Sequence, residues 1–272
     1  MTEWDMGKTG TTATVPGETA SKWLRRWDAQ QERYVADREE RFAVLCDVVE
    51  AALVDVAEPV VLDLGCGPGS LAGRLHERIP AAKIIGIDAD PLLLGLARGN
   101  YGDDITWVNA DLNSPTWRQN VPATIHAAVS TTALHWLPVE RLAELYRTLG
   151  GLMGPGGVFV DGDHMGVGTD PVSALAKTVG ERRAARAGVL ANEEWKPWWA
   201  ALKADPALAE QVEAHEAWAT EVSATRAADA STHSGTNALT VGEHSAMLTD
   251  AGFSSVAPVW QVGDDHVLVA VR

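Results

Sequence analysis

The stretch VVLDLGCGPGSLAGRL, residues 60–75, contains the strongest structural signal in the chain. A short apolar run, typical of a strand buried on both faces, leads into Gly65, Gly67 and Gly69, and an amphipathic segment follows. Glycine permits positive φ angles and lets a ligand approach the backbone, and the helix that follows presents free N–H groups at its N-terminus. The pattern predicts a strand–loop–helix unit that receives a charged cofactor, although a tight turn without a ligand has the same signature.

Alternating apolar runs and amphipathic segments continue after this unit. Later apolar runs cover residues 83–87, 105–109, 125–130 and 157–163, and segments with helical periodicity separate them. Near the C-terminus, a strand around 255–262, the turn GDD and the run HVLVAVR predict an antiparallel hairpin. We therefore predict an α/β fold with a Rossmann-like, doubly wound, mostly parallel seven-stranded sheet whose last strand is antiparallel.

Helical regions flank this predicted sheet on both sides in the sequence. We expect a flexible tail over residues 1–22 and an N-terminal helical cap over 23–57. The core is predicted to comprise residues 58–165 and 237–272. Residues 166–236 interrupt the strand–helix alternation with helical patterns, and we interpret them as a lid inserted after strand five.

Composition restricts the partners and the cellular compartment. The 272 residues include 37 acidic and 22 basic side chains, and a net charge of −15 argues against a nucleic-acid partner. No apolar run reaches the roughly 18 residues of a membrane helix, and the first residues lack a secretory signal. Cys46 and Cys66 have neither a metal-ligand nor a disulfide spacing. We expect a cytoplasmic protein with a small-molecule substrate and no membrane partner, and a homodimer is the default assembly.

A second motif restricts the choice of cofactor. The second strand ends in GIDADP, where Asp88 follows Gly65 at the separation that places a carboxylate on a ribose in Rossmann-like units. A helix cap is the alternative for this acidic segment, and Asp90 suits that role better. Dinucleotide folds prefer G-x-G-x-x-G, whereas here Ser70 follows G-x-G-x-G. The spacing favours S-adenosylmethionine over a nicotinamide dinucleotide.

At these motifs the chain resembles the class I S-adenosylmethionine-dependent methyltransferases, notably their small-molecule, trans-aconitate-methyltransferase-like branch. DLGCGPG (63–69) is similar to motif I, GIDADP (86–91) to the ribose-binding segment, NADLN (109–113) to the adenine-binding segment, and STTALHWL (130–137) to the motif after strand four. The resemblance implies transfer of a methyl group to an oxygen, nitrogen or carbon of a small, secondary metabolite, with S-adenosylhomocysteine as product.

The resemblance also implies a set of cofactor-binding residues. Loop backbone approaches the methionine part, Asp63 helps to hold the ammonium, Asp88 binds the ribose and Asp111 accepts from the adenine amino group. From the N-terminal segment, Tyr34 and either Arg38 or Arg41 face the methionine carboxylate, with an exposed charged helix as the alternative. The complete predicted set is Asp63, Gly65, Cys66, Gly67, Asp88, Ala89, Asp111, Leu112, Ser130, Tyr34 and Arg38.

Candidate catalytic residues follow strands four and five. A hydroxyl or amine acceptor is helped by a general base, and the candidates are His135, Asp161, Asp163 and His164. His135 is the best placed because residues beyond strand four line the crevice of an open sheet, although packing at a helix start also explains it. We predict no metal site, because residues 130–132, after strand four, lack the further carboxylate of metal-dependent relatives.

Tryptophan is unusually frequent, with 11 residues against three tyrosines and three phenylalanines. Large flat side chains in a lid would form an apolar pocket over the reacting methyl group, and we predict substrate contacts for Trp27, Trp136 and Trp199. The spacing of the lid tryptophans also fits the buried face of a helix. Two other functions stay open: a binding module or cyclase-like protein that keeps the fold without methylating, and, less favoured, a nicotinamide-dependent oxidoreductase.

Overall fold

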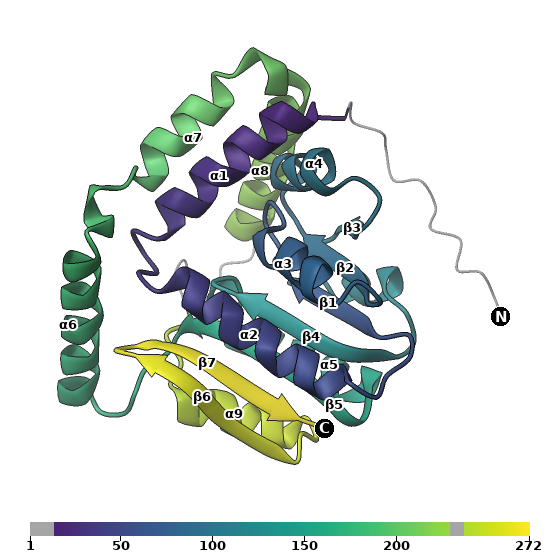
Figure 1. Cartoon of the computed structure of the whole chain (residues 1–272), viewed down its shortest axis with the longest axis vertical. Coiled ribbons are helices and arrows are strands. Elements are labelled where there is room, and N and C mark those ends of the chain that lie inside the picture. The colour runs from purple at the N-terminus through teal and green to yellow at the C-terminus, as the bar shows by residue number, and fades with distance from the viewer. Residues whose placement is uncertain (1–13, 229–236) are drawn as a thin grey trace.

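The computed structural model describes residues 14–228 and 237–272, and within them seven strands form one sheet in the order β3-β2-β1-β4-β5-β7-β6 (Figure 1). The strands are β1 (Val60–Leu64), β2 (Lys83–Asp88), β3 (Thr106–Asn109), β4 (Ile125–Thr131), β5 (Met153–His164), β6 (Ser255–Val262) and β7 (Asp265–Val271). Strands β1 to β5 pair in parallel, and β7 runs antiparallel to both β5 and β6. The predicted fold class is confirmed.

The strand order places a switch point at the carboxyl ends of β1 and β4, and the region beyond these strand ends is named the crevice. After β1 the chain moves outward through β2 to β3, and it then returns to place β4 on the other side of β1. The connections that leave the carboxyl ends of β1 and β4 therefore run in opposite directions along the sheet. Such a switch point is where open α/β sheets bind ligands.

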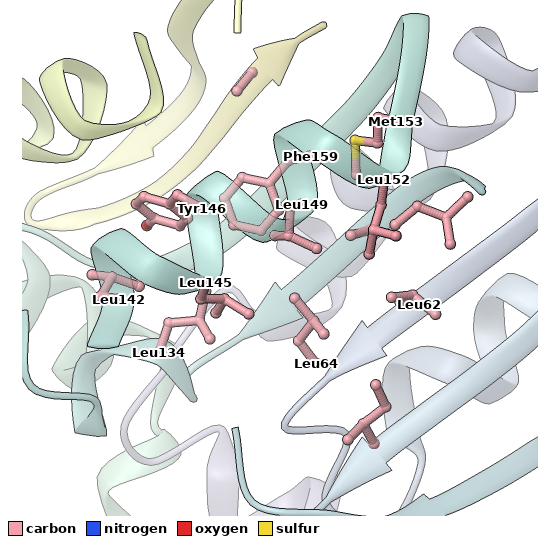
Figure 2. Packing of buried hydrophobic residues seen from close by; sticks show 14 of the residues in the cluster. Leu62, Leu64, Leu134, Leu142, Leu145, Tyr146, Leu149, Leu152, Met153 and Phe159 are labelled. Atoms are coloured by element: carbon pink, nitrogen blue, oxygen red, sulfur yellow. The ribbon is translucent and has the colours of Figure 1, made fainter. Parts of the chain in front are cut away.

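Helices cover both faces of the sheet. The helices are α1 (Gly17–Gln31), α2 (Arg38–Leu53), α3 (Ser70–Arg78), α4 (Pro91–Tyr101), α5 (Val139–Leu152), α6 (Asp170–Ala187), α7 (Trp195–Lys203), α8 (Ala209–Ala228) and α9 (Val241–Asp250). On one face, leucines of α5 interdigitate with Leu62 and Leu64 of β1 and Phe159 of β5 (Figure 2). On the other face, Phe42 and Leu45 of α2 pack with Leu71 and Leu75 of α3.

A third hydrophobic cluster attaches α1 and α7 to the core through α4. Trp23 of α1 and Trp198 of α7 are fully buried, with ring centroids 5.8 Å apart, and Leu92 and Leu96 of α4 lie beneath them. The figure shows α1 and α7 side by side at the top of the molecule, and α6 at its left edge (Figure 1). The lid and the N-terminal cap therefore share one packing layer.

The N-terminal boundary differs from the sequence prediction. Helix α1 begins at Gly17, inside the predicted tail of residues 1–22, because Val15 and Ala20 are buried against α4. A Cβ atom on Gly99 of α4 would lie 2.6 Å from the Val15 carbonyl oxygen, so glycine permits this close contact. Residues 1–13 of the predicted tail and 229–236 of the predicted lid lie outside the described residues. Within the described part of the chain, no helix has the length and apolar character needed to cross a bilayer.

Candidate functional site

The glycine loop between β1 and α3 forms one wall of the crevice. Gly65, Gly67 and Gly69 have φ angles of 70°, 53° and 87°. A Cβ atom on Gly65 would lie 2.4 Å from Cβ of Ala133, so this glycine lets the loops after β1 and β4 approach each other. At Gly67 the nearest atom to such a Cβ is Cζ2 of Trp27, at 3.7 Å. Trp27 of α1 therefore lies directly over the loop.

Asp88 at the end of β2 faces the same loop. Its Oδ2 accepts a hydrogen bond from the Gly67 N–H at 2.7 Å, and its Oδ1 accepts one from the Asp90 N–H at 2.9 Å. Burial raises the pKa of Asp88 to about 6. The hydrogen bonds from the two backbone N–H groups act in the opposite direction and lower it. Each oxygen keeps a free lone pair, so the carboxylate has the capacity to accept from two neighbouring hydroxyls.

Asp63 in β1 is a buried carboxylate without a cationic partner. Its side chain is fully buried, and neither oxygen receives a hydrogen bond of normal geometry from the described residues. Burial raises its pKa to about 7, and the nearby Ala72 amide offsets this only in part. Burying an unpaired acid beside a ligand loop is costly, and a bound ammonium group would relieve that cost. The acceptors present, Asp63 and Asp88, therefore fit a ligand that combines an amine with a ribose.

The predicted adenine segment lies beyond Asp88. The Asp111 carboxylate is exposed and accepts the Asn113 N–H at 2.8 Å, and Leu112 packs partly buried against the α5 side of the core. The Ala89 carbonyl accepts a hydrogen bond from the Asn109 amide at 2.9 Å. These contacts hold the ends of β2 and β3 together.

Two further predicted residues lie at the bottom of the crevice. The Ser130 hydroxyl donates to the Leu64 carbonyl at 2.9 Å, which ties the end of β4 to the end of β1. The Cys66 thiol is buried inside the glycine loop, and burial raises its pKa well above the usual range. A protonated thiol is unreactive, so Cys66 contributes shape and not chemistry.

Arg38 and Arg41, the two alternatives for contacting the methionine carboxylate, have different positions in the structure. Arg38 donates to Asp28 at 2.6 Å, and Asp28 in turn accepts the Ser70 hydroxyl at 2.7 Å, so this group braces α1 and α2 on α3. Arg41 is fully buried and donates to Asp265 of β7 and to the Thr131 hydroxyl of β4, each at 2.7 Å. Arg41, and not Arg38, therefore reaches the strand ends.

Tyr34 lies at the outer edge of this region. Its side chain is 47% exposed, and its hydroxyl accepts the Trp195 N–H at 3.1 Å. Its carbonyl is 3.3 Å from Nε2 of His164. The tyrosine thus connects the turn between α1 and α2 with the lid and with the end of β5.

His135 and Asp163 form a hydrogen-bonded pair at the mouth of the crevice. Nδ1 of His135 is 2.9 Å and 2.8 Å from the two carboxylate oxygens of Asp163. Burial alone would raise the pKa of Asp163, but the hydrogen bond and charge of His135, with the charge of Arg41, hold it below the usual value. Because Nδ1 of His135 is hydrogen-bonded to Asp163, Nε2 is the ring nitrogen that stays available to interact with a methyl-accepting group.

The other two catalytic candidates do not converge on His135. Asp161 is fully buried with both oxygens unpartnered among the described residues, and burial, followed by the charge of Asp163, raises its pKa well above the usual range. His164 contacts Asp264, with Nδ1 3.6 Å from Oδ1, and its pKa is raised because these contacts outweigh burial.

The predicted substrate tryptophans separate into two groups. Trp27 lies over the glycine loop and packs on Trp195 and Trp198, with centroids 5.4 Å and 5.0 Å away. Trp136 is 63% exposed and lies beside His135, with centroids 4.9 Å apart. Trp199 instead stacks on His215 of α8 at 4.9 Å. Trp27 and Trp136 thus border the crevice, and Trp199 belongs to the packing of the lid.

Sequence reasoning missed the contacts that dock the lid. Nδ1 of His215 is 2.9 Å from Oδ2 of Asp90, whose Oδ1 caps α4 by accepting the Leu92 N–H. It also missed the bridge from Asp28 to Ser70. No local pattern signals either contact, because the partners lie 125 and 42 residues apart.

Comparison with known proteins finds a matching family model and several curated relatives. The family described as "Methyltransferase domain" matches residues 61–157. The chain is 36% identical over 134 residues to trans-aconitate 2-methyltransferase of Azoarcus sp. (strain BH72), a match covering 48% of each chain. It is 38% identical over 98 residues to the protein of that name from Escherichia coli O139:H28 (strain E24377A / ETEC), covering 36% of each. The matches thus span about half the length of these relatives or less.

Solved structures show the same fold at low sequence identity. An O-methyltransferase family 2 protein from Planctomyces limnophilus DSM 3776, in complex with apigenin, has a TM-score of 0.53 and 14% identity, covering 91% of this chain and 62% of that one. A putative O-methyltransferase from Nostoc punctiforme PCC 73102 has a TM-score of 0.53 and 15% identity, covering 90% and 60%. Residues 61–157 are thus similar to the methyltransferase domain family, and they lie on a sheet of order 3-2-1-4-5-7-6.

Proposed function

We propose that the protein transfers a methyl group from S-adenosylmethionine to a hydroxyl oxygen of a small molecule, with His135 as the general base. The observation that carries this proposal is the hydrogen-bonded pair of His135 with Asp163 at the carboxyl ends of β4 and β5. The same fold is also compatible with a nitrogen or carbon acceptor. The pair favours an acceptor that must lose a proton.

The cofactor-binding residues are proposed from their chemistry. The Asp88 carboxylate, held by two backbone N–H groups, is suited to a ribose diol. The unpaired Asp63 carboxylate is suited to the ammonium of the methionine part, and the loop at Gly67 lets that part lie against the backbone. Trp27 covers the loop and helps to keep water from the reacting atoms.

When bound, S-adenosylmethionine supplies a methyl group on a positively charged sulfur. This methyl group would pass in line to the acceptor oxygen, and the electron pair of the sulfur–methyl bond would remain on sulfur. Nε2 of His135 takes the hydroxyl proton and later passes it to water. Asp163 fixes the Nδ1 proton and stabilises the imidazolium that forms, a contribution of about 100- to 10,000-fold in rate.

A carboxylate acceptor has less need of this pair. The relatives are named for trans-aconitate, which is already ionised at neutral pH, so its oxygen needs no base. A weakly acidic hydroxyl does need one. The pair at His135 therefore favours a hydroxyl acceptor for this chain.

The test uses the purified full chain. Calorimetry measures binding of S-adenosylhomocysteine, and methyl transfer from radiolabelled S-adenosylmethionine is followed over a panel of hydroxylated compounds. We expect transfer to a hydroxyl compound, and we expect His135→Gln to reduce it at least about 100-fold with cofactor affinity unchanged. Binding of a nicotinamide dinucleotide in place of S-adenosylhomocysteine would contradict the proposal. Cofactor binding without transfer to any acceptor would favour a non-methylating role.

A further inference from the structure

The residue that follows β4 has a strained backbone. Thr132 has a φ angle of 49°, and in the part of the chain that the structure describes only one other non-glycine residue, Ala238, has a positive φ. A β-branched side chain is disfavoured in this left-handed region, because its Cβ atom crowds the backbone. Such strain persists only where surrounding contacts hold it, and it is concentrated at ligand-binding and catalytic positions. Thr132 is therefore a candidate functional residue that the sequence motifs did not reveal.

Two contacts hold this strained segment in place. The Thr132 N–H donates a hydrogen bond to the Gly162 carbonyl of β5 at 3.0 Å. On the other side, Ala133 lies against Gly65, where an added Cβ atom would be 2.4 Å from Cβ of Ala133. The strained residue is thus fixed between the end of β5 and the glycine loop.

This position lies between the two halves of the proposed reaction. The glycine loop, which Ala133 contacts, is the proposed place of the cofactor. Gly162, which accepts the Thr132 N–H, directly precedes Asp163 in β5. The proposed base, His135, follows Thr132 by three residues and is hydrogen-bonded to Asp163. Thr132 is therefore beside both the cofactor loop and the base.

The Thr132 side chain is free to bind a ligand. It is half-buried, and its hydroxyl has no hydrogen-bond partner among the described residues. The two preceding hydroxyls are engaged, since Ser130 donates to the Leu64 carbonyl. Thr131 accepts from Arg41. We propose that the Thr132 hydroxyl hydrogen-bonds the oxygen of the methyl acceptor and orients it, an inference that rests on the proposed function.

The chemistry of a hydroxyl group explains how two side chains bind one oxygen. The oxygen of the methyl acceptor gives its proton to Nε2 of His135, and it has two further lone pairs. One lone pair faces the methyl group to be transferred, and the other accepts the O–H of Thr132. Two fixed hydrogen bonds thereby set the direction of the oxygen, and in-line displacement depends on that direction.

Three variants of Thr132 separate its hydroxyl from its shape. Thr132→Val removes the hydroxyl and keeps the β-branched shape, Thr132→Ser keeps the hydroxyl, and Thr132→Gly removes the side chain and relieves the strain. The probes are catechol, 4-nitrophenol and benzyl alcohol, with radiolabelled S-adenosylmethionine as methyl donor. For a probe that the wild type methylates, we expect kcat/KM at least about tenfold lower in the valine and glycine variants and near wild type in the serine variant. Calorimetry should give the same affinity for S-adenosylhomocysteine in all of them.

Ala238→Gly is the matched control for the relief of strain. Ala238 has a φ angle of 50° and is exposed, and it follows Asn237, whose N–H donates to the His135 carbonyl at 2.8 Å. Both glycine variants should unfold at or above the wild-type temperature, because glycine adopts a positive φ without strain. Only Thr132→Gly should lose activity.

Four results would overturn the inference. They are a loss of less than tenfold in Thr132→Val, an equal loss in Thr132→Ser, an equal loss in Ala238→Gly, and a lowered affinity for S-adenosylhomocysteine in Thr132→Val, which would place the hydroxyl on the cofactor. A wild-type protein that does not bind S-adenosylhomocysteine, or that binds it and methylates none of the probes, would instead refute the proposed function itself.

Discussion

Replacing Asp63 by asparagine is expected to change how the stability of the cofactor-free protein depends on pH. Burial raises the pKa of this carboxyl from 3.8 to about 7. The folded state therefore binds the proton more tightly than the unfolded chain. For such a group the contribution to stability is greatest at low pH, and it is lost as pH rises from about 4 to about 7.

The size of this effect follows from the shift. A rise of about three pKa units corresponds to about 4 kcal/mol once the pH exceeds both values, and about 2–3 kcal/mol of it develops between pH 5 and pH 8. The amide of the Asp63→Asn variant cannot titrate, so the variant escapes this loss. An asparagine without partners costs about 1–3 kcal/mol at every pH, so the difference between the two pH values is diagnostic.

Urea unfolding of both proteins at pH 5 and pH 8, without cofactor, measures that difference. Relative to wild type, the variant should gain about 2–3 kcal/mol on going from pH 5 to pH 8, while its affinity for S-adenosylhomocysteine falls about 10- to 100-fold because the ammonium loses its carboxylate. Asp103→Asn, at an exposed position, is the control and should show neither change. A stability difference that is the same at both pH values would refute the reasoning.

The remaining predictions concern the base, the ribose site and the lid. Asp163→Asn should lower kcat about 100- to 10,000-fold with S-adenosylhomocysteine affinity unchanged, because Nδ1 of His135 loses its carboxylate partner; an unchanged kcat would contradict the pairing. Asp88→Ala should weaken S-adenosylhomocysteine binding about 10- to 100-fold by calorimetry, and unchanged affinity would remove it from the site. His215→Ala should cost about 1–3 kcal/mol of stability by removing the contact to Asp90, and a thermal melt identical to wild type would argue against that contact.

The sequence was sufficient to predict the sheet and the loop. Continuous apolar runs give buried parallel strands wherever they occur, and positive φ at Gly65, Gly67 and Gly69 has a local cause. The position of Asp88 beside the loop was predictable for the same reason, because one strand–helix–strand unit sets its distance from the loop. These features depend on residues close together in the chain.

The arrangement of the cap and lid could not be predicted from the sequence. Arg38 and Arg41 are three residues apart on α2, so periodicity cannot distinguish which one reaches the strand ends. The choice is made by partners far away in the chain: Asp28 for the first, and Asp265 of β7 for the second. Likewise, only the fold shows that His135 meets Asp163, because parallel pairing of β4 with β5 brings their ends together.

These distant contacts connect the lid to the ribose site through one aspartate. Asp90 donates its N–H to Asp88, accepts the Leu92 N–H with one oxygen, and contacts His215 of α8 with the other. A ligand that shifts the Asp88 carboxylate by binding to it also shifts the start of α4, and with it the contact that docks α8. We therefore expect His215→Ala to weaken S-adenosylhomocysteine binding although His215 is not among the proposed cofactor ligands. Unchanged affinity in this variant, together with lowered stability, would show that the lid docks independently of the cofactor.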